Sequence, residues 1–241
     1  MNWSAPEPVV AEVVRSGFVE SQHRGTVVAL DVDGSVLFAV GVPLSLDTAL
    51  SPVVGAATFF VGSLFFTGAG FLQLVTSSEE LPSATPHEHA AAWFAALVRA
   101  RTVDWTASAI QFAGTLWFNV TTLRGLLDAS GTGDASAAAV WRPDAFGSVA
   151  FLVSSALAFA PEVRRRRHGH ARDRSWAIGA LNLVGSVFFG ISAVGARTDA
   201  STGQLVNEAW SNGGTVLGAL CFLAGAVLLL PRSPAYADVP G

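Results

Sequence analysis

Residues 51–75 of this chain are SPVVGAATFFVGSLFFTGAGFLQLV, a stretch that decides the fold class because it contains no charged residue. A helix of about 20 apolar residues crosses a bilayer core of about 30 Å. The rest of the chain supports the same assignment: 51% of its residues are apolar and 13% are charged, whereas soluble domains carry about 25% charged residues. The sequence therefore predicts an all-α integral membrane protein.

Five stretches are long and apolar enough to predict transmembrane helices: residues 51–75, 105–123, 145–160, 176–196 and 213–230. The third is the shortest, with 16 residues, which as a helix measure roughly 24 Å. Pro161 directly follows it and is expected to end it. The spans form one bundle over residues 46–231, followed by a polar C-terminal tail, residues 232–241.

Arginine predicts the orientation of these spans. Lysine is absent, and six of the fourteen arginines lie between Arg164 and Arg174. Short arginine-rich loops stay in the cytoplasm, which places this loop and the C-terminus on the cytoplasmic side of the membrane and the N-terminus outside. Nine arginines then lie inside, against three near span ends on the outer side: Arg124, Arg142 and Arg197. The cluster lacks interleaved aromatic residues, so nucleic-acid binding is not expected.

Two pairs of predicted spans align without a gap, which indicates a tandem helix-hairpin repeat. SAIQFAGTLWFNVTTL (108–123) aligned with GALNLVGSVFFGISAV (179–194) places Gln111 on Asn182 and Gly114 on Gly185. GSVAFLVSSA (147–156) aligned with GALCFLAGA (218–226) places Gly147 on Gly218. GAATFFVGS (55–63) fits the second pattern too. Since lipid provides no hydrophobic drive between helices, these glycines are expected to mark close helix contacts.

Gln111, Asn119 and Asn182 are the polar residues deepest in the predicted spans. The favoured interpretation is interhelical hydrogen bonding, worth about 0.6–2 kcal/mol per bond. A transporter would use the same amides to coordinate its substrate. No Asp, Glu, Arg or His lies inside the five predicted spans, which argues against a proton relay or a voltage sensor.

The paired segments LNLVGSVFFGISA (181–193) and GTVLGALCFLAGAVLLL (214–230) resemble the YrhK-like small integral membrane proteins of bacteria. The resemblance covers roughly residues 100–231 and rests on small-residue and aromatic patterns. The resemblance implies a multi-pass protein of the bacterial plasma membrane and supplies no established reaction or catalytic residues.

Residues 1–45 are predicted to be a separate N-terminal tail. TVVALDV and SVLFAVG alternate around Asp33-Gly34, a signal for a type I′ β-hairpin. VVAEVVRSGFVESQHRGTVVALDVDGSVLFAVG (9–41) resembles the start of bacterial L-asparaginase II of the thermolabile, serine–lysine kind. That family next supplies an arginine-serine segment and a lysine, whereas this chain continues VPLSLDTALSPVV and contains no lysine. The tail is therefore interpreted as a fragment that the bundle does not need.

The remaining candidate sites have simple interpretations. His87 and His89 could approach a metal, but two histidines in a polar loop are expected to contact water, and His168 and His170 lie among arginines that repel cations. Cys221, the only cysteine, is expected to be a packing residue. No metal or cofactor is therefore predicted.

The bilayer is the expected partner and oligomerisation stays open. Anionic lipid headgroups are an alternative ligand for four consecutive arginines: Arg164, Arg165, Arg166 and Arg167.

Three functional hypotheses follow from these features. The first is a non-enzymatic integral membrane protein built from repeated helix hairpins. The second is a small uncoupled transporter or channel subunit, which a polar cavity inside the bundle would favour. The third, disfavoured because the serine–lysine segment is absent, is an asparaginase-related hydrolase.

Overall fold

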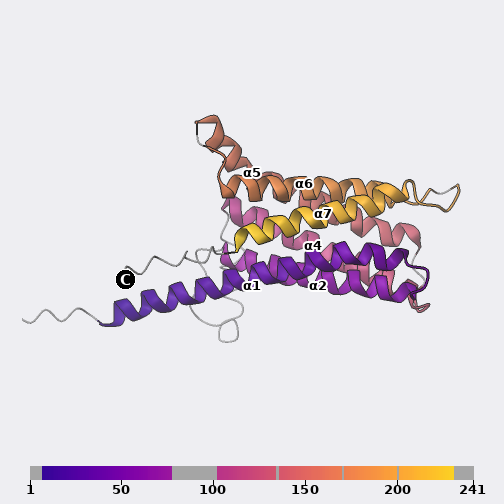
Figure 1. Ribbon diagram of the computed structural model, residues 1–241, viewed down its shortest axis with the longest axis horizontal. Coiled ribbons are helices and arrows are strands. Elements are labelled where there is room, and N and C mark those ends of the chain that lie inside the picture. Colours follow the sequence, from indigo (N-terminus) through magenta and orange to yellow (C-terminus); the bar gives the residue numbers. More distant parts are fainter. Residues whose placement is uncertain (1–6, 78–101, 134–135, 170, 200, 231–241) are drawn as a thin grey trace, which may run out of the picture.

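The chain folds into helices that run side by side in a computed structural model, which describes residues 7–77, 102–133, 136–169, 171–199 and 201–230 (Figure 1). Within these ranges the fold is all-α, as predicted. The helices are α1 (Glu7–Leu46), α2 (Pro52–Thr76), α4 (Val103–Ala129), α5 (Ala137–Arg167), α6 (Arg174–Gly195) and α7 (Glu208–Leu229).

Polar caps set where the helices start. Ser51, Thr102, Ser136, Asp173 and Asn207 each precede the first helical residue and accept a hydrogen bond from a backbone N–H in the first turn. These side chains satisfy donors that a helix start otherwise leaves unpaired. A cap therefore fixes the start of each helix after α1.

The predicted β-hairpin in the N-terminal tail is wrong, because residues 25–46 continue α1 as an apolar helix long enough to cross a membrane. Asp33-Gly34 is a turn signal only locally. In the bundle Gly34 is buried against α2, where a Cβ atom would lie 3.2 Å from the Phe66 ring and the Gly62 carbonyl oxygen. The glycine thus serves a close helix contact, and the segment belongs to the bundle.

Each of the five predicted spans corresponds to a helix, none reaching more than one residue beyond it, and α5 extends furthest beyond its predicted bounds of 145–160. It begins at Ala137 and continues through Pro143 and Pro161 to Arg167. The expected stop at Pro161 is therefore wrong. Proline removes the helical hydrogen bond to the carbonyl four residues earlier, here that of Leu157. Leu157 is only half-buried and Pro161 is exposed, so the lost bond lies outside the buried core. This final part of α5 projects past its neighbours (Figure 1).

Within the described ranges, five helical segments are long and apolar enough to cross a membrane: Gly25–Leu46, Pro52–Thr76, Ala139–Arg167, Arg174–Gly195 and Glu208–Leu229. These five segments differ from the five predicted spans: they include part of α1, which was not predicted as a span, and they do not include the more polar α4. Yet α4 packs between α2 and α5, and α1 packs against both α2 and α7. The helices therefore close a ring in the order α1, α2, α4, α5, α6 and α7.

The same reciprocal contact between glycine and phenylalanine occurs in three helix pairs. In each pair, a Cβ atom added to either glycine would lie 2.9–3.2 Å from a phenylalanine ring of the other helix. The glycines and facing rings are Gly34–Phe66 and Gly62–Phe38 in α1–α2, Gly114–Phe151 and Gly147–Phe118 in α4–α5, and Gly185–Phe222 and Gly218–Phe189 in α6–α7. All six phenylalanines are buried in one core cluster.

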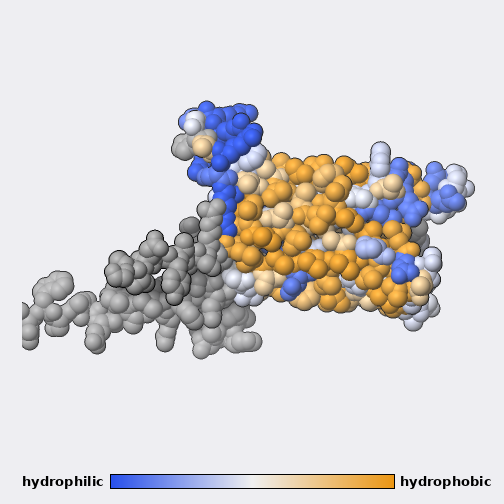
Figure 2. All heavy atoms as spheres, viewed as in Figure 1, coloured by the Kyte–Doolittle hydropathy of each residue, from blue (hydrophilic) through white to orange (hydrophobic). Residues whose placement is uncertain are grey.

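The face of the ring that Figure 2 shows is mostly apolar between its two ends. Large hydrophobic side chains such as Val149, Val194 and Phe146 are exposed. Hydrophilic residues gather at the ends, with the arginine-rich end of α5 on one side (Figure 2). This distribution matches a multi-pass membrane protein, whose lipid-facing side chains are apolar.

Candidate functional site

Two cavities enter the ring from opposite ends. The first has a volume of about 290 Å³ and lies near the ends of α2 and α7, where Thr76 and Leu229 are the last helical residues. We call it the amide cavity after its amide side chains. Its polar lining comprises Asp31, Gln73, Thr76, Gln111 and Asn182, which belong to four helices.

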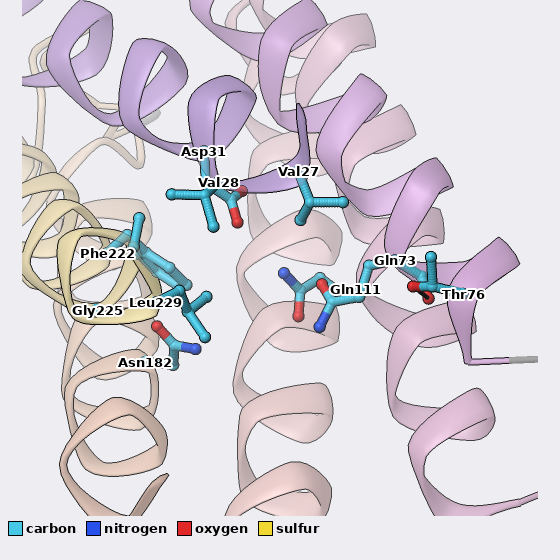
Figure 3. A pocket seen from close by; sticks show the side chains of 11 residues that line it. Val27, Val28, Asp31, Gln73, Thr76, Gln111, Asn182, Phe222, Gly225 and Leu229 are labelled. Atoms are coloured by element: carbon cyan, nitrogen blue, oxygen red, sulfur yellow. Dashed lines mark hydrogen bonds between the residues drawn. The ribbon is translucent and has the colours of Figure 1, made fainter. Parts of the chain in front are cut away.

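Three of these side chains reach toward a common space from three helices: Asp31 from α1, Gln111 from α4 and Asn182 from α6 (Figure 3). Each stands three residues before a buried glycine, namely Gly34, Gly114 or Gly185. Residues three apart lie on nearly the same helix face. The glycine contacts therefore hold the three polar groups on corresponding faces of their helices.

Neighbouring helices accommodate the two amides differently. Ser154 of α5 donates a hydrogen bond to the Ala107 carbonyl and also lies 3.2 Å from Gln111 Oε1. On α7 a Cβ atom at Gly225 would lie 2.8 Å from Asn182 Oδ1, so the glycine leaves room for this side chain. Both predicted amides thus face the bundle interior and line one cavity.

Asp31 is the one ionisable residue among those that line the amide cavity. It is half-buried, and within the described part of the chain its carboxyl group makes no hydrogen bond or ion pair. Asp33, two residues further along α1, is exposed on the outer face instead. An ionisable side chain inside a membrane bundle marks a functional site unless another role is found for it.

The sequence predictions missed Asp31 because residues 1–45 were assigned to a separate tail. The signal was available: ALDVDGSVLFAV (29–40) aligns without a gap with ALNLVGSVFFGI (180–191) and places Asp31 on Asn182. The five predicted spans contain no Asp, Glu, Arg or His, but α1 adds Asp31 to the bundle.

The second cavity, about 260 Å³, lies near the start of α5 and the end of α6. We call it the hydroxyl cavity, because Thr121, Thr122, Ser192 and Thr215 line it. These hydroxyl groups already bond within the bundle; Ser192 Oγ, for example, donates to the Ser211 carbonyl at 2.7 Å. Asp144 is the one ionisable residue that lines this cavity among the residues described there.

The phenylalanine core cluster separates the two cavities. Phe189 lies at its centre, with ring centroids 6.1 Å from Phe38, 5.9 Å from Phe118 and 5.6 Å from Phe222. Phe38 and Phe118 line the hydroxyl cavity, whereas Phe222 lines the amide cavity. A single layer of packed rings therefore stands between the two polar spaces.

Two other predicted residues have packing roles. Asn119 Nδ2 donates to Thr67 Oγ1 at 2.8 Å and so links α4 to α2, while Asn119 Oδ1 is buried without a partner among the described residues. Cys221 lies against Gly185, where a Cβ atom would be 3.1 Å from the cysteine Cβ. Neither residue lines the amide or the hydroxyl cavity.

The arginine-rich end of α5 forms its own charged contacts. Arg165 pairs with Glu162 at 3.1 Å and Asp173 at 3.2 Å, and Arg172 lies 4.5 Å from the centre of the Trp176 ring. The backbone N–H of Trp176, followed by the Arg165 charge, lowers the pKa of the Asp173 carboxyl below its usual value. Arg164, Arg166 and Arg167 are exposed, as lipid headgroup binding requires.

Metal-binding side chains do not gather anywhere in the described ranges, where no group of three or more His, Cys, Asp or Glu residues is present. His87, His89 and His170 lie outside these ranges, and His168 is the exposed residue that follows α5.

Comparison with models of protein families, with curated proteins and with solved structures finds no match to this chain.

Proposed function

We propose that this protein is a small channel or uncoupled transporter whose solute pathway runs through the ring of helices. One observation carries the proposal: two polar cavities enter the ring from opposite ends and meet at the phenylalanine core cluster. In this conformation the rings close the path. Packed hydrophobic constrictions gate membrane pores by excluding water.

The inward-facing acids favour this proposal over a purely structural bundle. Asp31 and Asp144 each line a cavity, although an ionisable group inside a membrane costs several kcal/mol. A bundle with only a packing role gains nothing from these carboxyl groups. The amides Gln111 and Asn182, which also line the first cavity, are then solute contacts. The role needs no enzymatic chemistry, and the YrhK-like resemblance stays a prediction.

The proposed architecture is a threefold repeat of helix hairpins, α1–α2, α4–α5 and α6–α7. The recurring glycine–phenylalanine contacts support it. The repeat is also supported by three polar residues that each stand three positions before a buried glycine: Asp31, Gln111 and Asn182. A ring of repeated units lets equivalent residues meet around one central path, which suits a transport pathway.

A reconstitution experiment tests the pathway. The purified protein is inserted into liposomes, and release of radioactive rubidium, methylammonium, chloride and glycerol is measured separately. We expect at least one solute to leave faster than from protein-free liposomes. Phe189→Ala should raise this rate because it removes the ring between the cavities.

Phe146→Ala is the matched control. Phe146 belongs to α5 and is 56% exposed on the outer surface, where it packs against Trp117. Its truncation should leave solute release unchanged. If neither the natural protein nor Phe189→Ala releases any of the four solutes faster than empty liposomes, the pathway proposal is wrong.

A further inference from the structure

We infer that the pathway is selective for small monovalent cations and that Asp31 binds them in the amide cavity, together with Gln111 and Asn182. The selectivity rests on the proposed function, whereas the binding site can be measured without transport.

The charge of the two cavities points to a cation. Asp31 lines one and Asp144 lines the other, and no basic residue is found among the described residues that line either. A path with a carboxylate at each end attracts cations and repels anions. An anion would therefore meet a like charge on both sides of the phenylalanine core cluster.

The single carboxyl group in the amide cavity determines the valence. Buried charges are stable when an opposite charge pairs with them. Asp31 has no ion pair within the described part of the chain, and one bound positive charge would neutralise it. Divalent cations such as Ca²⁺ are usually held by several carboxylates, whereas the other polar groups here are neutral amides and one hydroxyl.

The size of the cavity determines what kind of cation fits. Its volume is about 290 Å³, and one water occupies about 30 Å³ of liquid. The space therefore exceeds that of a bare ion and suits either an inorganic ion with several water molecules or a small primary ammonium ion. The carbonyl oxygens of Gln111, Asn182 and Gln73 and the hydroxyl of Thr76 can contact both kinds.

The described arginines near this end of the bundle have contacts of their own: Arg172 lies over the Trp176 ring, and Arg174 donates a hydrogen bond to the Leu230 carbonyl. Arg165 is neutralised by Glu162 and Asp173. The helix that carries Arg164–Arg167 projects away from the ring (Figure 1). Exposed charges are screened over about 8 Å at physiological salt.

Equilibrium binding to the purified full-length protein in detergent tests the site, with radioactive rubidium and radioactive methylammonium as separate probes and radioactive glycerol as the neutral probe. We expect at least one cation to bind with one ion per chain and glycerol not to bind. Binding of rubidium alone identifies an inorganic ion, binding of methylammonium alone identifies an organic one, and binding of both, each displacing the other, identifies a shared site.

Substitutions locate the binding. Asp31→Asn should weaken cation binding at least about tenfold, because a buried charge pair is lost. Asp31→Glu keeps the charge and should bind. Asp33→Asn, two residues away on the exposed face of α1, is the matched control and should bind like the natural protein.

A gain-of-function variant separates loss of the site from misfolding. Asn182→Asp adds a second carboxyl group to the amide cavity, so calcium should displace rubidium or methylammonium from this variant but not from the natural protein. The inference is wrong if neither cation binds the natural protein, or if Asp31→Asn binds unchanged. Cation binding without solute release in liposomes would instead reject the pathway and keep the site. Release of glycerol without cation binding would reject the binding site and keep the pathway.

Discussion

At the scale of single residues, glycines decide how closely the helices approach. Gly213 and Gly214 are neighbours near the start of α7, yet their surroundings differ. A Cβ atom on Gly214 would lie 2.6 Å from the Phe188 carbonyl oxygen and 2.7 Å from the Ser192 backbone nitrogen, both in α6. A Cβ atom on Gly213 would meet nothing within 4 Å. Backbone atoms cannot rotate aside as a flexible side chain can, so only Gly214 is required by the packing.

This difference predicts opposite effects for two adjacent substitutions. Gly214→Ala should force α6 and α7 apart and destabilise the protein by about 1–3 kcal/mol, as overpacked cores do. Gly213→Ala should be neutral or stabilise by up to about 1 kcal/mol, since alanine favours helix more than glycine. Thermal unfolding in detergent measures both. Equal melting temperatures for the two variants would show that α6 and α7 do not approach closely here.

At the scale of secondary structure elements, α1 is the helix whose role differs most from the sequence prediction. As a fragment unrelated to the bundle, residues 1–45 would contribute nothing to its stability. Instead Phe38 is buried, with its ring centroid 5.3 Å from Phe66 of α2 and 6.1 Å from Phe189 of α6. The second half of α1 therefore completes the ring of helices and part of its core.

The element-scale prediction compares two side chains of α1. Phe38→Ala should destabilise the bundle by about 3–5 kcal/mol because it leaves a cavity in the core. Val36→Ala is the control: Val36 is 41% exposed on the outer face, and its truncation should change stability little. Chemical denaturation of both purified variants in detergent provides the measurement. An unchanged midpoint for Phe38→Ala would restore the interpretation of this segment as a dispensable tail.

At the scale of the whole molecule, ring closure changes the predicted topology. Five spans placed the termini on opposite sides of the membrane. We predict that α4 crosses the bilayer together with the five apolar helices, and six crossings place both termini on the side of the Arg164–Arg174 loop. The arginine distribution becomes more asymmetric, with three arginines outside (Arg124, Arg142 and Arg197) and the other eleven inside. The positive-inside rule therefore favours six crossings and a cytoplasmic N-terminus.

Reporter fusions decide between five and six crossings. A reporter fused to the N-terminus should be cytoplasmic, like one placed after Arg172, whereas one placed near Gly203 should be external. The N-terminal fusion is the informative one, because five crossings put it outside. An external N-terminal reporter would mean that either α1 or α4 does not cross the bilayer.

The sequence by itself determined the membrane class and the location of the five predicted spans, which match helices to within one residue at each end that they overrun. These follow from hydropathy and from short patterns that stay within one segment. The same kind of local evidence misassigned Asp33-Gly34 as a turn and Pro161 as a helix end. In both cases the local signal is real, but its effect depends on whether another helix or solvent surrounds the residue.

Only the tertiary structure decided that α1 closes the ring, that Asp31 joins Gln111 and Asn182 in one cavity, and that Asp33 faces outward. Asp31 and Asp33 differ by two residues, which on a helix turns one side chain about 200° from the other. No property of either residue alone distinguishes them. The physical reason is that Gly34 packs against α2, and this contact fixes the rotation of α1 and hence which aspartate faces the interior.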